Sequence, residues 1–361
     1  MPTPSPRTRP RPHHGHVHRP GRHALAPMLV LALAAAGCGH GRARNQAQAV
    51  PATSSTTTTT SAATTTTKAA TKTSGHAATK PKPQAAGPAR VIVVVEENHS
   101  YSQIIGNPSA PFINQLAGHG TLLTGYFAVS HPSLPNYLAM TSGDTQGITS
   151  DCPTCTVPAD NLGAQLNHAG IRWKAYAQSL PGPCSNTPNA GDYARKHEPF
   201  MYYDTVRNDG SCGARVVPTS QLDADVAAGT LPSFAFVTPD ILHDMHGNGG
   251  QSDAQRVAAG DAWLRDLSTR LVASPAWRQD TRLVVTFDEG EGAEGAAGCC
   301  GGVANGGHVL TIVTGPRVPS GQDSRPYSHY ALLRSIEARF GLPYLRHAGD
   351  PASTTIPAIA G

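Results

Sequence analysis

Two clusters of carboxylate and amide side chains each follow a short apolar run that is rich in β-branched residues. The first includes Glu97 and Asn98, and the second is Asp288-Glu289. Carboxylates at the end of a buried strand cost free energy unless they bind something, and oxygen ligands from two strand ends can converge on a hard divalent cation. We therefore predict a divalent metal site built from these four residues, with the identity and number of the metal ions left open. A solvated turn would also explain either cluster alone.

A candidate nucleophile, Ser133, stands in the segment His131-Pro-Ser-Leu-Pro-Asn-Tyr137. Pro135 suits the first turn of a helix, because proline lacks the amide hydrogen that would go unpaired there. Ser133 is then expected at or just before the helix N-terminus, where free backbone N–H groups and the positive end of the helix dipole favour a phosphate. A serine beside a metal can ionise and attack phosphorus. The alternative interpretation is a plain N-cap.

Two histidines and two aspartates lie within seven residues after another strand-like run, at Asp240, His243, Asp244 and His246. This composition is typical of metal ligands or acid–base groups. We predict that the two aspartates extend the metal site, and that the two histidines contact the substrate. His308, which follows two glycines, is predicted as a further ligand. Ordinary polar loops are the alternative for both segments.

These side chains need a scaffold that brings distant segments together. Five short runs have the apolar, β-branched composition of strands buried on both faces, as in a parallel sheet: residues 90–95, 171–176, 234–237, 282–287 and 309–313. Helical patterns cover residues 254–273 and 328–340. Strands that alternate with helices predict a three-layer α/β/α sandwich with a mainly parallel central sheet. Ligands in such folds bind at the carboxyl ends of the strands, where the acidic clusters fall.

The first 88 residues differ in composition from the rest of the chain. Residues 1–38 combine a basic start, a short apolar run and the pair Gly37-Cys38, which predicts a signal peptide with a lipoprotein cleavage box and lipidation of Cys38. An ordinary signal peptide with an incidental cysteine is the alternative. Residues 39–88 are rich in Thr, Ala and Pro, which predicts a disordered linker. The predicted catalytic domain covers residues 89–361.

The charge pattern agrees with export. The formal net charge is +4, and much of the basic excess lies before residue 25, upstream of the apolar run. That position fits targeting, so we expect no nucleic-acid partner. We expect an exported protein, either secreted or a cell-surface lipoprotein, whose membrane contact depends on a lipid anchor at Cys38.

Six cysteines follow Cys38, and an even number in an exported protein favours disulfides. The candidate local pairs are Cys152 with Cys155 and Cys184 with Cys212. Cys299 and Cys300 either form a vicinal bridge or pair elsewhere. A zinc site on Cys152-x-x-Cys155 is an alternative, but no second spaced cysteine pair supports it.

Taken in order, these segments resemble the bacterial phosphoesterase family of acid phosphatases and phospholipase C enzymes, within the alkaline phosphatase superfamily. The resemblance covers about residues 91–345 and is most specific in four segments: Glu97-Asn-His-Ser100, His131-Pro-Ser-Leu-Pro-Asn-Tyr137, Thr238 to His246, and Thr286-Phe-Asp-Glu-Gly290. It implies an alkaline-phosphatase-like fold, Ser133 as nucleophile, and Asn136 as a hydrogen-bond donor to a phosphate oxygen. Glu289 stands where some relatives carry Asp, which leaves the coordination geometry open. Asp240 stands where many carry Asn, and this extra carboxylate leaves the number of metal ions, one or two, open.

The function that these residues and the resemblance imply is metal-dependent, acid-phosphatase-like hydrolysis of phosphate monoesters through a phosphoserine intermediate. His243, His246 or His308 would stabilise phosphate oxygens or protonate the leaving alkoxide. A phospholipase C or phosphodiesterase would use the same core. A cell-surface binding protein on a stalk would explain the Thr-rich linker but not the two acidic clusters. A metal-free serine hydrolase lacks support, because no Gly-x-Ser-x-Gly elbow surrounds Ser133.

Overall fold

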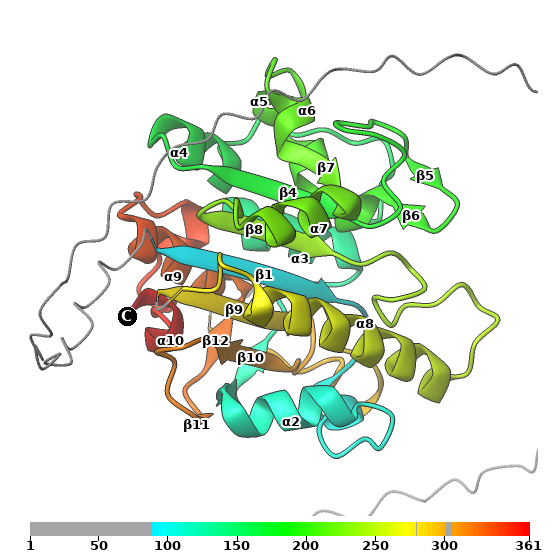
Figure 1. Ribbon diagram of the computed structural model, residues 1–361. Helices are drawn as coiled ribbons and strands as arrows, with labels where there is room; N and C mark the ends of the chain where they lie inside the picture. The colour runs from blue at the N-terminus through cyan, green and yellow to red at the C-terminus, as the bar shows by residue number, and fades with distance from the viewer. Residues whose placement is uncertain (1–88, 279, 301–304) are drawn as a thin grey trace, which may run out of the picture. The chain divides into compact units, whose positions relative to one another are not determined.

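The computed structural model describes residues 89–278, 280–300 and 305–361 (Figure 1). The predicted signal peptide, the linker and Cys38 lie outside the described residues. Across the part of the chain that is described, no helix combines the length and the apolar composition needed to cross a bilayer.

A central sheet of eight strands carries the fold, in the order β11-β2-β10-β9-β1-β8-β4-β7. β10 runs antiparallel to both of its neighbours, and the other neighbouring strands are parallel. The prediction of a mainly parallel sheet is therefore confirmed. The strands are β1 (Arg90–Glu96), β2 (Thr121–Leu123), β4 (Trp173–Ala177), β7 (Val216–Pro218), β8 (Phe234–Thr238), β9 (Thr281–Phe287), β10 (Thr311–Thr314) and β11 (Gly321–Asp323).

Strand β1 lies in the middle of the sheet between β8 and β9. Every residue of β1 and every residue of β9 is buried, as expected for strands covered on both faces by helices. The five strand-like runs of the sequence correspond to β1, β4, β8, β9 and β10. Because β1, β8 and β9 are parallel, their carboxyl ends meet at one edge of the sheet, where the acidic clusters follow.

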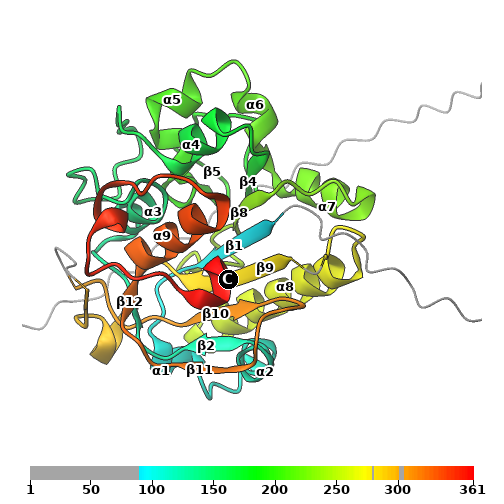
Figure 2. The same ribbon diagram turned by 90° about the vertical axis from the view of Figure 1, so that its left-hand side faces the viewer.

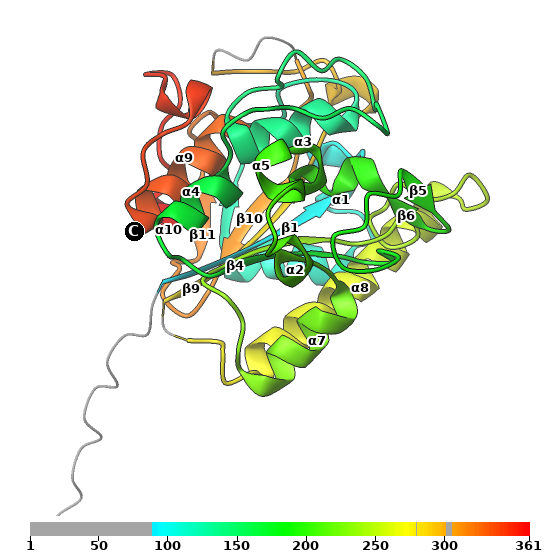
Figure 3. The same cartoon turned by 90° about the horizontal axis from the view of Figure 1, so that it is seen from above.

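Helices cover both faces of the sheet. Figure 3 shows α3, α4 and α9 on one face and α2, α7 and α8 on the other, which confirms the three layers. The helices are α1 (Tyr101–Ile104), α2 (Pro111–His119), α3 (Ser133–Ser142), α4 (Leu162–His168), α5 (Asp204–Arg207), α6 (Cys212–Arg215), α7 (Thr219–Ala228), α8 (Asp253–Ala273), α9 (His329–Phe340) and α10 (Pro357–Ala360).

The two helices predicted from periodicity form α8 and α9. Ser252 caps α8, and its side chain accepts a hydrogen bond from the N–H of Gln255. α9 begins after Ser328, as predicted, although no hydrogen bond from the Ser328 side chain caps it. It ends at Gly341, which has a φ of 67°. That left-handed conformation suits glycine because it has no Cβ.

Short elements complete the described structure. β3 (Tyr126–Phe127) pairs with β12 (Tyr327–Ser328), and β5 (Asn189–Ala190) pairs with β6 (Tyr193–Ala194). The 3₁₀ helices are η1 (Arg195–His197), η2 (Pro199–Tyr202), η3 (Gly292–Glu294) and η4 (Arg346–Gly349). The C-terminus lies near the amino end of β9 (Figure 2), where the Arg282 side chain donates to the Gly361 carbonyl. The opposite edge of the sheet carries the acidic clusters.

Three disulfides join the six cysteines of the described part: Cys152–Cys155, Cys184–Cys212 and Cys299–Cys300. Both predicted local pairs are confirmed, and the last two cysteines form the vicinal bridge. Because the sulfurs of Cys152 and Cys155 are joined to each other, they cannot serve as the thiolate ligands of a zinc ion.

Candidate active site

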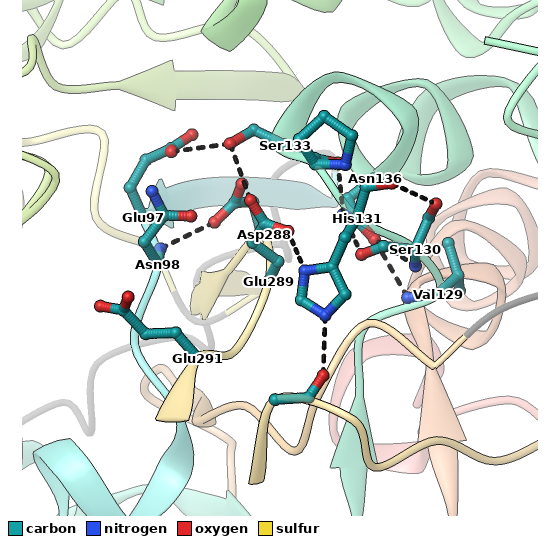
Figure 4. Close-up of polar contacts among 12 residues, drawn as sticks. Glu97, Asn98, Val129, Ser130, His131, Ser133, Asn136, Asp288, Glu289 and Glu291 are labelled. Atoms are coloured by element: carbon teal, nitrogen blue, oxygen red, sulfur yellow. Dashed lines mark hydrogen bonds and ion pairs between the residues drawn. The ribbon is translucent and has the colours of Figure 1, made fainter. Parts of the chain in front are cut away.

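Ser133 is the first residue of α3 and is buried between two of the predicted carboxylates. Its Oγ lies 3.0 Å from Oε2 of Glu97 and 3.1 Å from Oε1 of Glu289 (Figure 4). Glu97 follows β1 and Glu289 follows β9, so three segments far apart in the sequence meet at this serine. The hydroxyl can donate its proton to either carboxylate, which is the arrangement that activation of a nucleophile requires.

Asp288 and Asn98 lie beside these two carboxylates and complete the predicted ligand set. The backbone N–H of Asn98 donates to Oδ1 of Asp288 at 3.0 Å. Asn98 has a φ of 53°, a left-handed conformation that asparagine adopts more readily than most residues. Oδ2 of Asp288 is buried and has no hydrogen-bond partner within the described structure. The four predicted metal ligands are thus brought to one place around Ser133 (Figure 4).

Two cations that were not predicted from the sequence, Lys196 and His197, stand beside these carboxylates. Both belong to η1. Nζ of Lys196 lies 3.1 Å from Oγ of Ser133 and 3.8 Å from Oε2 of Glu97. The His197 ring lies between Glu97 and Asp244, with 3.0 Å from Nε2 to Oε1 and 3.0 Å from Nδ1 to Oδ2.

The charges of the cluster follow from burial and from these neighbours. Burial alone would lower the pKa of His197, but the Glu97 and Asp244 carboxylates outweigh it and raise the pKa to about 9. Burial opposes ionisation of Glu97, yet the positive charges of His197 and Lys196 hold its pKa below the usual range. Burial and then the negative charges of Glu97 and Glu289 raise the pKa of Asp288 well above its usual value. Cations thus outweigh burial at Glu97, whereas burial and neighbouring negative charge outweigh the Lys196 ammonium at Asp288.

This imbalance bears on metal binding. Carboxylates, an amide and a serine oxygen form the donor set that hard divalent cations prefer. The unpartnered Oδ2 of Asp288 and the raised pKa of that group mark a point where a cation would be stabilised. Among the residues that the structure describes, no three or more His, Cys, Asp or Glu side chains are already arranged to hold a metal ion. The chemistry of the donors fits the predicted metal.

Asn136 occupies a different place from the one predicted. Its Oδ1 accepts from the N–H groups of Val129 and Ser130, both at 3.0 Å. Its Nδ2 donates to the carbonyls of Ser130 and Pro132, at 2.8 and 3.2 Å. Both amide hydrogens are therefore already used, and none remains for a phosphate oxygen. Asn136 shapes the loop that leads into Ser133 (Figure 4).

The segment from Asp240 to His246 divides into two parts. Asp244 contacts His197 and so joins the cluster, and its backbone carbonyl accepts from the N–H of Glu97 at 2.7 Å. Asp240 instead pairs with His243, at 2.7 Å between Oδ1 and Nδ1, and accepts from Ser179 Oγ at 2.6 Å. No hydrogen bond or ion pair of the described structure joins Asp240 or His243 to the Ser133 cluster. These contacts do not support the predicted extension of the metal site through Asp240.

His246 lies near the cluster, whereas His308 has its own partners. The rings of His246 and His197 have centroids 6.2 Å apart. His308 stacks on Tyr101 with ring centroids 4.7 Å apart, its Nδ1 lies 3.4 Å from Oε1 of Glu294, and its Nε2 donates to the Thr124 carbonyl at 3.0 Å. Its ring nitrogens are therefore engaged away from Ser133, which does not support its prediction as a metal ligand.

A cavity of about 450 Å³ opens beside the cluster. Lys196, Asp151 and His246 supply polar groups to its lining, and Tyr193 and Ile241 supply apolar surface. Ser133 does not line this cavity, but Lys196 lines it and also contacts Ser133.

Lys196, His197 and Asp151 could not be found by looking at the ends of the main strands. η1 follows the small β5–β6 hairpin, and Asp151 lies in a loop beside a disulfide. The only local signal is the dense run Arg195-Lys-His-Glu198, whose charged side chains stand next to buried aromatic residues.

Comparisons with known proteins agree with this geometry. A model described as the Phosphoesterase family matches residues 107–343. The chain is 38% identical over 269 residues to a phosphatidylinositol-3-phosphatase of Mycobacterium tuberculosis, covering 74% of this chain and 82% of that protein. It is 30% identical over 243 residues to an acid phosphatase of Aspergillus fumigatus, covering 64% of this chain and 50% of that protein. It is 27% identical over 267 residues to phospholipase C A of Mycobacterium tuberculosis, covering 62% of this chain and 48% of that protein.

A solved structure described as a protein in the alkaline phosphatase superfamily from Vibrio parahaemolyticus shares the fold. Its TM-score is 0.52 at 14% identity, and the match covers 74% of this chain and 71% of that one. The chain spans only about half the length of the fungal acid phosphatase and the phospholipase C named above. The family match nevertheless covers most of the described domain, and we conclude that this chain belongs to the Phosphoesterase family and is a phosphoric ester hydrolase with an alkaline-phosphatase-like fold.

Proposed function

We propose that this protein hydrolyses phosphate monoesters through a phosphoserine intermediate formed on Ser133. The observation that carries the proposal is the position of Ser133 Oγ at a helix start, with two carboxylates and an ammonium within 3.1 Å. A serine hydroxyl is a weak nucleophile until a neighbouring base takes its proton or a cation stabilises its oxyanion. Both kinds of neighbour are present here.

The reaction has two displacements. Oγ of Ser133 forms a bond to phosphorus while the bond from phosphorus to the alcohol oxygen breaks, and the hydroxyl proton passes to Glu289, whose Oε1 lies 3.1 Å away. Water then attacks the phosphoserine, which returns the serine hydroxyl and releases phosphate. Buried charges fixed around the phosphorus stabilise the transition state because they need no reorganisation.

A divalent cation is part of this proposal. Glu97, Asn98, Asp288 and Glu289 would hold it, and when bound it would neutralise charge on the transferring group. The buried, unpartnered Oδ2 of Asp288 supports this assignment.

Among the three predicted histidines, His246 is best placed to protonate the leaving alkoxide, because it lines the cavity that Lys196 also lines. Nδ1 of His246 donates to the Gly247 carbonyl at 2.8 Å, so proton exchange would occur at Nε2. His243 and His308 are engaged with other partners.

The relatives favour a monoester over a diester substrate. The phosphatidylinositol-3-phosphatase and the acid phosphatase are named for phosphate monoesters, and they are more similar to this chain than the phospholipase C is. A phospholipase C or phosphodiesterase activity remains the alternative on the same core.

The test is a substrate panel on the full chain, with and without a chelator. p-Nitrophenyl phosphate and phosphatidylinositol 3-phosphate represent monoesters, whereas bis(p-nitrophenyl) phosphate and phosphatidylcholine represent diesters. We expect monoester hydrolysis that the chelator abolishes and that is lost in Ser133→Ala but kept in the matched control Ser130→Ala. Monoester activity that survives in Ser133→Ala would exclude the serine mechanism, and faster diester hydrolysis would favour the alternative.

We also infer that the protein is exported, either secreted or as a lipoprotein anchored at Cys38. Three disulfides support this, because disulfides persist in oxidising compartments. Cell fractionation of the wild type and of Cys38→Ser tests both parts. We expect the protein outside the cytoplasm, and its release from the membrane by the substitution.

A further inference from the structure

Lys196 is held between the nucleophile and the cavity. Its Nζ has three polar neighbours: Ser133 Oγ at 3.1 Å, Asp151 Oδ2 at 3.1 Å and Glu97 Oε2 at 3.8 Å. The Lys196 side chain is 17% exposed, and the residue lines the cavity of about 450 Å³. The ammonium therefore contacts the serine, and the same residue lines the neighbouring cavity.

Asp151 fixes this ammonium relative to Ser133. One carboxylate oxygen of Asp151 accepts from Lys196, and the other accepts from the backbone N–H of Leu134 at 3.0 Å. Leu134 follows Ser133 in the first turn of α3. A single carboxylate thus joins the lysine to the turn that carries the nucleophile.

The loop that carries Asp151 is itself anchored. It is closed by the Cys152–Cys155 disulfide. Arg195, the buried neighbour of Lys196, donates to the carbonyls of Pro153 and Met201 at 3.0 and 2.7 Å. The hydroxyl of Tyr202 donates to the Cys152 carbonyl at 3.1 Å. The same short segment therefore presents Lys196 and holds the loop of its carboxylate partner.

An ammonium at this position would lie close to the oxygens of the reacting phosphoryl group. The atom that Ser133 attacks must come within about 3–3.5 Å of Oγ, and Nζ is already 3.1 Å from Oγ. A phosphoryl group that enters from the cavity side would therefore bring a nonbridging oxygen into hydrogen-bond reach of Nζ. The attack places negative charge on these oxygens and on Oγ, where a fixed cation has its largest effect.

We propose that Lys196 is a catalytic residue that donates to the transferring phosphoryl group and to the Ser133 oxyanion, and that Asp151 is the residue that positions it. This inference rests on the proposed function, since it assumes attack by Ser133. Lys196 keeps its protons throughout and acts as a hydrogen-bond donor. A metal held by Glu97, Asn98, Asp288 and Glu289 would make a separate contribution, although Lys196 and this site share Glu97 as a neighbour.

The experiment compares Lys196→Met, Lys196→Arg and Asp151→Asn with wild type on p-nitrophenyl phosphate, with orthovanadate as a mimic of five-coordinate phosphorus. Lys174→Met is the matched control, because Lys174 is another partly buried lysine with an aspartate partner, Asp225, at 2.6 Å. We expect Lys196→Met to lower kcat/KM at least about 100-fold and to weaken vanadate inhibition by a similar factor, while bound metal stays unchanged. Lys196→Arg keeps the positive charge, so its kcat/KM is expected to be at least tenfold higher than that of Lys196→Met. Asp151→Asn should lower kcat about tenfold with little change in KM, and the control should match wild type.

The outcomes separate this inference from the proposed function. Activity in Ser133→Ala would overturn the proposed function itself. An inactive Ser133→Ala together with a Lys196→Met variant that keeps kcat/KM and vanadate inhibition within threefold of wild type would overturn the role of Lys196 alone. Loss of bound metal in Lys196→Met would also overturn it, because the lysine would then act through the metal site. If Lys196→Met does not fold, Lys196→Gln replaces it with the same expected loss. If neither neutral variant folds, Asp151→Asn is used instead: a kcat about tenfold lower with little change in KM supports the proposal, and an unchanged kcat overturns it.

Discussion

Nε2 of His197 lies 3.0 Å from Oε1 of Glu97, and the opposite ring nitrogen lies 3.0 Å from Oδ2 of Asp244. A ring between two carboxylates is stabilised in its doubly protonated form, which agrees with its pKa of about 9. His197 therefore acts as a fixed cation that ties the segment after β8 to the segment after β1.

The first prediction concerns this cation. His197→Gln leaves two buried carboxylates without their shared positive charge, so the free energy of unfolding should fall by about 3–5 kcal/mol. Urea denaturation at pH 6 measures it. His168→Gln, on an exposed histidine of α4, is the matched control and should stay within about 0.5 kcal/mol of wild type. Equal stability of both variants would show that the His197 contacts contribute nothing net.

The second prediction separates a loop role from a substrate role for Asn136. Asn136→Ala removes the acceptor of one buried and one partly buried N–H group, which should destabilise the fold by about 1–3 kcal/mol. Because the loop leads into Ser133, we expect kcat to fall while the inhibition constant of inorganic phosphate changes little. Differential scanning calorimetry and steady-state kinetics measure the two effects. A large loss of phosphate affinity at unchanged stability would restore the direct phosphate contact that the sequence suggested.

The third prediction concerns close backbone packing at Gly306. A Cβ at this position would lie 2.5 Å from the backbone nitrogen and 2.6 Å from the carbonyl oxygen of Ser130. The Gly306 carbonyl also accepts from the N–H of Gly290, which follows Glu289. Gly306→Ala should therefore destabilise the fold and lower activity together. Gly118→Ala, in an open exposed position of α2, should be neutral or stabilise by up to about 1 kcal/mol. Thermal melting of both variants checks the contrast.

The fourth prediction is a pH dependence that arises away from the site, at Glu337 of α9. Burial raises the pKa of Glu337 to about 8, although the N–H of Leu345 donates to it. A carboxyl group with a raised folded-state pKa stabilises the fold fully below its unfolded pKa of about 4.5, and this contribution is lost as the pH rises toward 8. Wild type should therefore lose more stability between pH 5 and pH 8 than Glu337→Gln. Parallel slopes in urea titrations of the two proteins would contradict this assignment.

The central part of the fold could be predicted because its signals are local and strong. The short run Val91–Val95 is rich in β-branched residues, which is typical of a strand covered on both faces, and the Gly341 that ends α9 fits a left-handed turn. Parallel strands bring their carboxyl ends together, so the meeting of Glu97, Asp288 and Glu289 followed from the strand assignment.

The remaining parts of the site depend on contacts that periodicity does not encode. Lys196 and His197 come from a 3₁₀ turn outside the main sheet, and only tertiary packing brings them to Glu97. The sequence motif identified Asn136 as a residue of the site. It could not show which groups the amide contacts, because these are carbonyl and N–H groups of the loop backbone. Asp240 and His243 illustrate the same limit. They form an i,i+3 ion pair with each other, and no side-chain hydrogen bond or ion pair of the described structure joins them to the Ser133 cluster.

The Cys152–Cys155 disulfide closes the loop that begins beside Asp151, and Asp151 orients the lysine next to the nucleophile. If Asp151 orients Lys196 as proposed, the oxidation state of Cys152 and Cys155 would bear on the geometry around Ser133. A chain that folds under reducing conditions would contain every reactive group and still lack the closed loop that orients the ammonium. Oxidation of this pair would then be a maturation step, with full catalytic competence beginning only after the bond has formed.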